Sequence, residues 1–214
     1  MRNILAVIMV IALFGCSSKN EETNLVGQWN PGDTSVESWL FQWSPGMPQS
    51  PITSGYGFTF TFPTVDGVHY ITRKPWTALT TKVVVKGTLS FMGSPIFQLK
   101  EACDGRAQAR VYFQRTGDDW GGQGDMQYYR WWYTKPIELM QVGDFELTAL
   151  LSDRENWISV FGQNAATASA YFEQAIANMD RIGLTFGGSC GGYGHGVFVT
   201  GGTATFTVQS YTVQ

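Results

Sequence analysis

The chain has 214 residues, of which 14% are aromatic and 14% charged, and it carries 25 glycines and a formal net charge of −3. This composition is typical of a turn-rich, all-β extracellular protein, and the mild acidity excludes nucleic acid as a partner, because phosphates require a basic patch. The part that follows residue 15 has the length of a single domain that buries most of its apolar surface and needs no cross-links for stability.

The first feature along the chain is an apolar N-terminal segment that predicts an export signal. Arg2 precedes an uncharged run from Ile4 to Phe14, which is too short to cross a bilayer as a helix but long enough for a signal-peptide core. The run closes with Leu13-Phe14-Gly15-Cys16, which resembles the lipobox of bacterial lipoproteins. We expect removal of residues 1–15 and acylation of Cys16, with the lipid bilayer as a partner. An uncleaved anchor helix and a general secretory signal are the alternatives.

Residues 16–24 predict a lipidated polar tether that leads into one domain, residues 25–214. Ser17 and Ser18 follow Cys16 with no Asp, which resembles the sorting pattern of lipoproteins sent to the outer membrane rather than kept at the inner membrane. No further apolar run is long enough for a transmembrane helix. The expected location is therefore the bacterial cell envelope. The Trp-rich region 25–54 matches no pattern that we can interpret.

Period-two alternation predicts about ten strands separated by Gly, Pro and Asp turn signals. In residues 56–62, Tyr56, Phe58, Phe60 and Phe62 share one face. The other expected strands are residues 69–73, 83–91, 96–100, 109–115, 127–134, 145–151, 181–186, 196–200 and 203–213. One short crossover helix is expected at about 167–180, where Phe172 and Ala175 belong to a core-facing apolar stripe. This pattern predicts a two-sheet antiparallel β-sandwich of jelly-roll type.

The C-terminal part supports this fold by resemblance. Residues 181–188, a glycine-rich loop with Gly194-His195-Gly196, and the long alternating segment 197–213 resemble the end of jelly-roll domains of the carbohydrate-binding-module and galactose-binding kind. The resemblance implies a β-sandwich that binds sugar. It lies in the pattern of about the last 130 residues, so it identifies no binding residue.

A glycine-rich loop between two strands, residues 115–133, is the predicted hairpin and the predicted site. With the loop centre near Gly121, the pairs Gln114–Tyr128, Tyr112–Arg130 and Arg110–Trp132 lie on one face, opposite an apolar face of Val111, Phe113, Tyr129, Trp131 and Tyr133. We expect the first face to be open, with Trp120 at its lip. Aromatic planes beside hydrogen-bond donors suit a sugar. The candidate ligand-binding residues are Arg110, Tyr112, Gln114, Asp118, Asp119, Trp120, Tyr128, Arg130 and Trp132.

Other roles are open for the same residues. The arginines and aromatic residues can instead form stabilising cross-strand cation–π pairs. Asp118, Asp119 and Asp125 can supply the two carboxyl groups of a glycosidase, cap turns, or hold a structural Ca²⁺. We expect no cofactor, and a zinc site is poorly supported because His69 and His195 lack metal-ligand spacing to a cysteine.

With Cys16 acylated, Cys103 and Cys190 are left as a candidate disulfide in an oxidising compartment. The sequence favours a membrane-anchored, non-catalytic module that binds a glycan. A structural or adhesin-like lipoprotein that binds another protein, and a polysaccharide hydrolase or lyase that uses the loop aspartates, are the alternatives. The oligomeric state has no signature in the sequence.

Overall fold

The computed structural model describes residues 39–43, 52–54, 57–75, 77–101, 105–190 and 193–214. The predicted signal peptide, Cys16 and the predicted tether lie outside the described residues. The elements in chain order are β1 (Leu40–Trp43), β2 (Ile52–Ser54), β3 (Gly57–Thr61), β4 (Val68–Arg73), β5 (Lys82–Leu99), β6 (Ala107–Arg115), η1 (Gly124–Tyr128), β7 (Arg130–Tyr133), β8 (Ile137–Glu138), β9 (Gly143–Leu150), η2 (Arg154–Asn156), β10 (Trp157–Ser159), α1 (Ser169–Ala177), β11 (Met179–Gly188) and β12 (Val197–Val213).

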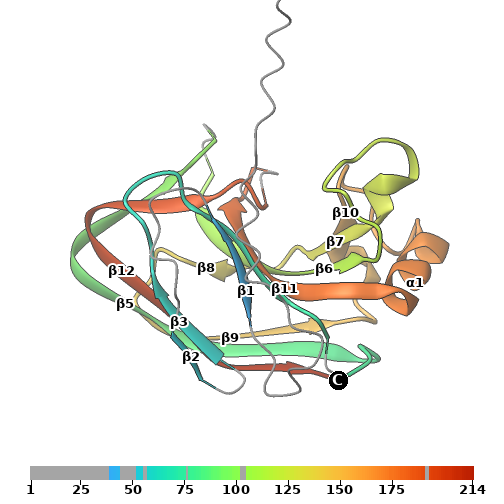
Figure 1. The fold of residues 1–214 in the computed structure, drawn as a ribbon, viewed down its shortest axis with the longest axis horizontal. Coiled ribbons are helices and arrows are strands. Elements are labelled where there is room, and N and C mark those ends of the chain that lie inside the picture. Colours follow the sequence, from blue (N-terminus) through green and yellow to red (C-terminus); the bar gives the residue numbers. More distant parts are fainter. Residues whose placement is uncertain (1–38, 44–51, 55–56, 76, 102–104, 191–192) are drawn as a thin grey trace, which may run out of the picture.

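The described strands join into one curled antiparallel sheet. Its main path runs β10-β7-β6-β11-β4-β12-β3-β2, with β1 beside β4, β8 beside β6, and β5 and β9 continuing from β12. In Figure 1 the long β5 and β12 curve around one side, and α1 lies at the opposite end near β6 and β11. The all-β prediction is confirmed. The finer prediction of two jelly-roll sheets is not confirmed, because the described strands follow one hydrogen-bonded path.

Two predicted turns are bends within long strands. The predicted strands 83–91 and 96–100 are joined in the single strand β5, which ends at Leu99, and the predicted strands 196–200 and 203–213 are joined in β12, which begins at Val197. The glycines that signalled turns lie opposite each other, with Gly93 paired to Gly202 and a register shift between Thr200 and Gly202. Gly93 and Gly201 have positive φ, which lets both strands bend together without breaking their pairing.

The concave side of the sheet holds the core. Phe58 and Phe60 of β3 and Phe62, directly after it, are buried on one face, as the alternation predicts, and their rings contact Phe206 of β12. The helix prediction is also confirmed, since Phe172 and Ala175 of α1 are fully buried. Phe172 packs against Phe113 with 5.7 Å between ring centroids. Period-two alternation in the strand and helical spacing in α1 therefore correctly identified the buried face of each element.

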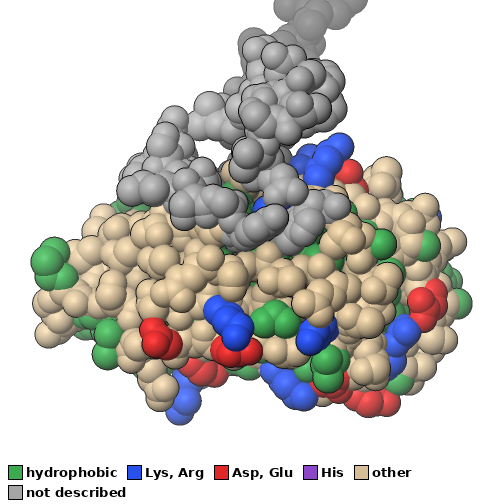
Figure 2. Space-filling model, turned by 90° about the horizontal axis from the view of Figure 1, so that it is seen from below, with side chains coloured by type: hydrophobic (Ala, Val, Ile, Leu, Met, Phe, Trp, Pro, Cys, Tyr) green, Lys and Arg blue, Asp and Glu red, His purple; other side chains and the backbone are tan. Residues whose placement is uncertain are grey.

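The outer surface is mixed in charge. On the face drawn in Figure 2, acidic and basic side chains are interspersed rather than gathered by sign. Lys86 of β5 and Glu146 of β9, both exposed, approach to 3.1 Å. Within the described ranges, no helix has the length and apolar character needed to cross a bilayer.

Candidate functional site

The predicted hairpin of β6 and β7 is present, but its register differs from the prediction. Tyr112 lies opposite Trp132, and Gln114 lies opposite Arg130. The predicted Gln114–Tyr128, Tyr112–Arg130 and Arg110–Trp132 pairs are wrong, because η1 replaces the start of the expected strand and β7 begins only at Arg130. A shift of two residues leaves the side chains of β6 and β7 on the faces that alternation gave them. Tyr129, predicted on the apolar face, instead precedes β7, is half-exposed and lies against Arg115, so that part of the prediction is wrong.

We use the name polar face for the convex side of β4, β6, β7 and β11. Cross-strand pairing places Thr185 of β11 between Arg110 of β6 and Tyr70 of β4, so strands distant in sequence share this face. Its residues are Tyr70, Gln108, Arg110, Tyr112, Gln114, Arg130, Trp132 and Thr185.

The polar face is covered, so the prediction of an open face is wrong. The exposed fraction is 5% for Arg110, 0% for Tyr112 and 7% for Trp132. The loop between β6 and β7 folds back over the sheet and places Trp120 against Tyr70. Tyr193, from the segment before β12, covers another part of the same face. Strand alternation assigns a face but does not report which loops cover it.

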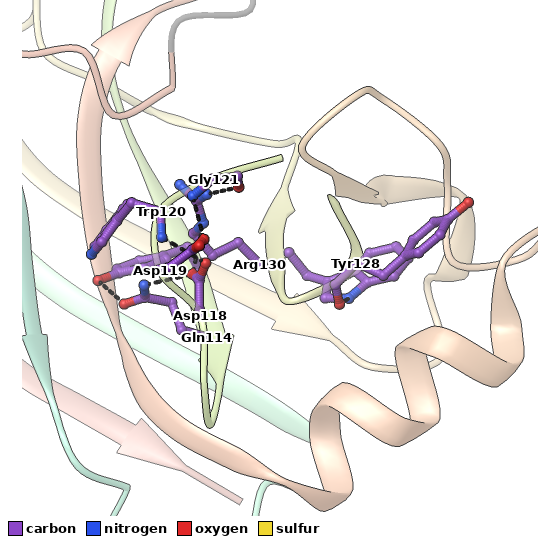
Figure 3. Close-up of polar contacts among 9 residues, drawn as sticks. Gln114, Asp118, Asp119, Trp120, Gly121, Tyr128 and Arg130 are labelled. Atoms are coloured by element: carbon purple, nitrogen blue, oxygen red, sulfur yellow. Dashed lines mark hydrogen bonds and ion pairs between the residues drawn. The ribbon is translucent and has the colours of Figure 1, made fainter. Parts of the chain in front are cut away.

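A buried ion pair anchors the first of these covering segments. Nε of Arg130 lies 2.7 Å from Oδ2 of Asp118, and 8% and 2% of the two side chains are exposed. Gln114 donates its amide hydrogen to the same carboxylate oxygen over 2.8 Å, and Arg130 donates a second hydrogen bond to the Gly121 carbonyl over 2.5 Å. Figure 3 shows these groups clustered around Trp120. They hold the loop against the sheet.

The protonation of this pair is governed by burial. Burial raises the pKa of Asp118, and the Gln114 hydrogen bond and the Arg130 charge lower it. Burial likewise lowers the pKa of Arg130, and the Asp118 charge opposes that shift. Each charge therefore offsets part of the desolvation penalty of the other inside the protein.

Trp120 adopts the left-handed backbone region, with φ of 64°. This conformation is strained for a bulky residue and persists only where surrounding contacts impose it. Asp118 accepts the Trp120 backbone hydrogen over 3.0 Å, the indole stacks on Tyr70 with centroids 4.3 Å apart, and the guanidinium carbon of Arg130 lies 4.6 Å from its centroid. With 37% of the residue exposed, Trp120 forms a rim of the polar face.

The loop aspartates have structural partners. Besides the ion pair of Asp118, Asp119 accepts the backbone hydrogen of Gly121 over 2.7 Å, which is a turn-capping contact. Asp125 interacts with Tyr171 of α1, where its charge raises the pKa of the phenol. In the portion of the chain that the structure describes, no three His, Cys, Asp or Glu side chains are grouped to hold a metal ion.

Tyr128 does not lie on the polar face. It belongs to η1, stacks on Tyr171 with centroids 4.0 Å apart, and lies 6.2 Å from the ring of Trp131. Figure 3 shows it beside the helix and apart from Arg130 and Trp120. The inclusion of Tyr128 among the residues of this face was wrong for the same reason as the register.

A second group on the polar face, the Arg110 cluster, consists of Arg110, Trp132, Thr185 and Tyr193. The Arg110 guanidinium donates to the Thr134 carbonyl and to the side-chain oxygen of Gln108. Its carbon lies 4.2 Å from the ring centroid of Tyr193, which also makes an edge contact with Trp132 at 6.2 Å. Tyr193 thus covers side chains from two neighbouring strands.

Three buried polar atoms of this cluster have no hydrogen-bond partner: Nε of Arg110, Nε1 of Trp132 and Oγ1 of Thr185. Thr185 is 0% exposed. Buried donors are normally paired, because each unpaired group costs about 1–3 kcal/mol of desolvation. Three such atoms on one covered face, beside aromatic rings, mark the Arg110 cluster as a candidate binding site.

Sequence reasoning identified Arg110 and Trp132 but missed Thr185 and Tyr193. Thr185 reaches the site only through the pairing of β11 with β6, which alternation along one strand cannot reveal. Tyr193 had a usable signal, because it is an aromatic residue between glycines, as Trp120 is in the hairpin loop. A large ring in a glycine-rich segment folds back onto the domain in both places.

Cys190 is exposed and disulfide-bonded. Cys103 lies outside the described residues, so the pairing of these two cysteines stays a prediction. The Nδ1 atom of the half-exposed His195 contacts a carboxylate oxygen of Glu101.

Protein-family models, curated proteins and solved structures gave no match to the chain.

Proposed function

We propose that this protein is a lipid-anchored, extracytoplasmic, non-catalytic module that binds a glycan at the Arg110 cluster. The observation that carries the proposal is the set of unpaired buried donors on Arg110, Trp132 and Thr185. A sugar supplies hydroxyl oxygens for such donors, while its C–H surfaces pack on aromatic rings such as Tyr193. The half-buried Tyr193 covers the donors, so binding requires its side chain to move.

The non-catalytic character rests on the state of the loop carboxylates. Asp118 is ion-paired inside the protein, and Asp119 caps a turn. A glycosidase needs one carboxyl group as acid and a second as base or nucleophile, both directed at the sugar. The contacts of these two aspartates disfavour the hydrolase alternative. The envelope location, at the outer membrane, rests on the Cys16 lipobox and on Ser17 and Ser18.

The binding proposal is tested on a glycan array with detergent-solubilised full-length protein and its Trp132→Phe variant. The variant keeps a ring but loses the indole N–H, so we expect about 3- to 10-fold weaker glycan binding, the effect of one hydrogen bond. Trp39→Phe is the matched control, because the buried Trp39 indole also lacks a hydrogen-bond partner but lies in the core. Equal loss in both variants contradicts this site.

Other outcomes of the array favour the alternatives. If no glycan binds and a purified envelope protein does, the adhesin-like role replaces ours. Release of reducing ends from a bound polysaccharide shows a hydrolase, and release of unsaturated ends shows a lyase. Either outcome overturns the non-catalytic proposal.

The anchor is tested by Cys16→Ser. Each acyl methylene buried in a bilayer contributes about 0.8 kcal/mol, so the wild type should enter the detergent phase on cloud-point separation. We expect the variant to remain in the aqueous phase, with Ser17→Ala as a control that behaves as wild type. Persistent detergent partitioning of Cys16→Ser would instead support an uncleaved apolar helix.

A further inference from the structure

The two buried arginines of the polar face differ in how their charge is balanced. Arg130 contacts the carboxylate of Asp118 directly. Arg110, also 5% exposed, donates only to a carbonyl and an amide oxygen, and no carboxylate of the described residues forms an ion pair with it. Glu138 lies opposite Gln108 and accepts a 2.6 Å hydrogen bond from it. Burial lowers the pKa of Arg110, and the Glu138 charge raises it without a direct contact. A buried cation without a contacting anion is costly.

The unpaired atoms beside Arg110 are hydrogen-bond donors. Nε of Arg110 and Nε1 of Trp132 can only donate, and the hydroxyl of Thr185 can donate or accept. A sugar hydroxyl that accepts here must also donate its own hydrogen elsewhere. A carboxylate accepts through both oxygens, donates nothing and balances the guanidinium charge, and such charge-assisted bonds are about twice as strong as neutral ones.

The members of the cluster are close enough to act together. Thr185 lies directly opposite Arg110 across the β6–β11 pair, and a Cβ added at Gly194 would lie 3.8 Å from the Thr185 methyl. Tyr193, the neighbour of Gly194, contacts both the guanidinium of Arg110 and the ring of Trp132. Residues 193 and 194 thus lie next to the side chains of Arg110, Trp132 and Thr185.

We propose that the ligand of this site is an acidic glycan, and that Arg110, Trp132 and Thr185 bind the carboxylate of a uronic-acid residue. The inference rests on the proposed glycan-binding function and names its ligand class. The Tyr193 ring then packs on the sugar that carries the carboxylate. The Arg130–Asp118 pair takes no part in the contact, because its charges are already balanced.

The experiment compares acidic oligosaccharides with neutral copies of themselves. Oligogalacturonate, oligoglucuronate and oligomannuronate are titrated calorimetrically into the full-length protein in detergent, each beside its carboxyl-reduced counterpart. Linkage and ring stereochemistry are the same within each pair, so only the charge differs. We expect at least one acidic probe to bind at least 10-fold more tightly than its reduced form.

The variants assign this preference to the cluster. Arg110→Gln is expected to weaken binding of the acidic probe by about 10- to 100-fold, the size of a hydrogen bond to a charged group, and binding of the reduced probe by only about 3- to 10-fold, the size of a neutral hydrogen bond. Arg115→Gln is the matched control, because it makes the same charge change at the end of the same strand while its side chain lies over Tyr129 and bonds to Gln174 of α1. Equal weakening by Arg115→Gln contradicts direct contact.

Thr185→Val is the second test of the site, and it applies even if Arg110→Gln fails to fold. Valine fills the same volume without the unpaired hydroxyl, so the free protein should be as stable as wild type or more stable, while acidic binding falls about 3- to 10-fold. In addition, the acidic probe should move the Trp132 indole N–H proton resonance downfield, and the reduced probe should not. If Thr185 and Trp132 were purely structural, neither the loss of acidic binding nor the shift of the indole resonance would occur.

The outcomes separate the two proposals. Equal affinity for acidic and reduced probes overturns the acidic-glycan inference and leaves glycan binding intact. Binding of no probe here and of no glycan on the array overturns both. Acidic binding that survives both Arg110→Gln and Thr185→Val overturns the site.

Discussion

Trp131→Ala is expected to lower the free energy of unfolding by about 3–5 kcal/mol, enough to unfold a marginally stable domain. Trp131 is fully buried on the concave side of β7. Its ring makes an edge contact with Phe172 of α1 at 4.9 Å, and its indole N–H donates to the Tyr128 carbonyl over 2.8 Å. Alanine leaves a cavity between the sheet and the helix. Urea denaturation followed by circular dichroism measures the loss.

The adjacent Trp132 provides the comparison. From alternation alone, Trp132→Ala should leave the melting temperature within a few degrees, but its 7% exposure now predicts clear destabilisation as well. The two residues differ in their phenylalanine variants. Trp131→Phe leaves the Tyr128 carbonyl without its donor, whereas Trp132→Phe removes an N–H that has no partner. Equal losses from Trp131→Phe and Trp132→Phe would contradict this difference.

Arg130→Met is expected to lower the free energy of unfolding by about 3–5 kcal/mol at neutral pH, because it leaves the Asp118 carboxylate buried without its counter-charge. Methionine retains an apolar stem beneath Trp120. Adding Asp118→Asn to Arg130→Met should recover much of the loss, since no buried charge is then left. Lys86→Met is the control. It breaks an exposed pair with Glu146 and should cost only about 0–1 kcal/mol.

The Arg130→Met loss should also depend on pH. Burial already raises the pKa of Asp118, and removing the Arg130 charge that opposes this shift raises it further. A carboxyl group whose folded pKa lies above its unfolded value stabilises the protein below the unfolded pKa and loses that contribution as pH rises through the folded pKa. The difference between wild type and Arg130→Met should therefore grow from pH 4 to pH 7. A difference that is constant with pH contradicts a buried, titrating Asp118.

Local alternation and composition predicted much of the scaffold. Phe58, Phe60 and Phe62 alternate with small residues, and a strand places such residues on one side of the sheet. The same rule separated Trp131 from Trp132, even though the predicted pairing of β6 with β7 was displaced. The helical spacing of Phe172 and Ala175 identified α1 and its buried side. Each of these features depends on neighbours within one element.

The sequence by itself determined the all-β class, the faces of the strands, the core-facing helix and the presence of Arg110 and Trp132 on one polar face. Only the tertiary structure decided that this face is covered, that Asp118 neutralises Arg130 but not Arg110, and that Thr185 and Tyr193 join the site. The physical reason is distance along the chain. Side-chain direction follows from local backbone geometry, whereas the order of strands and the folding of loops onto a sheet depend on contacts between residues far apart in sequence.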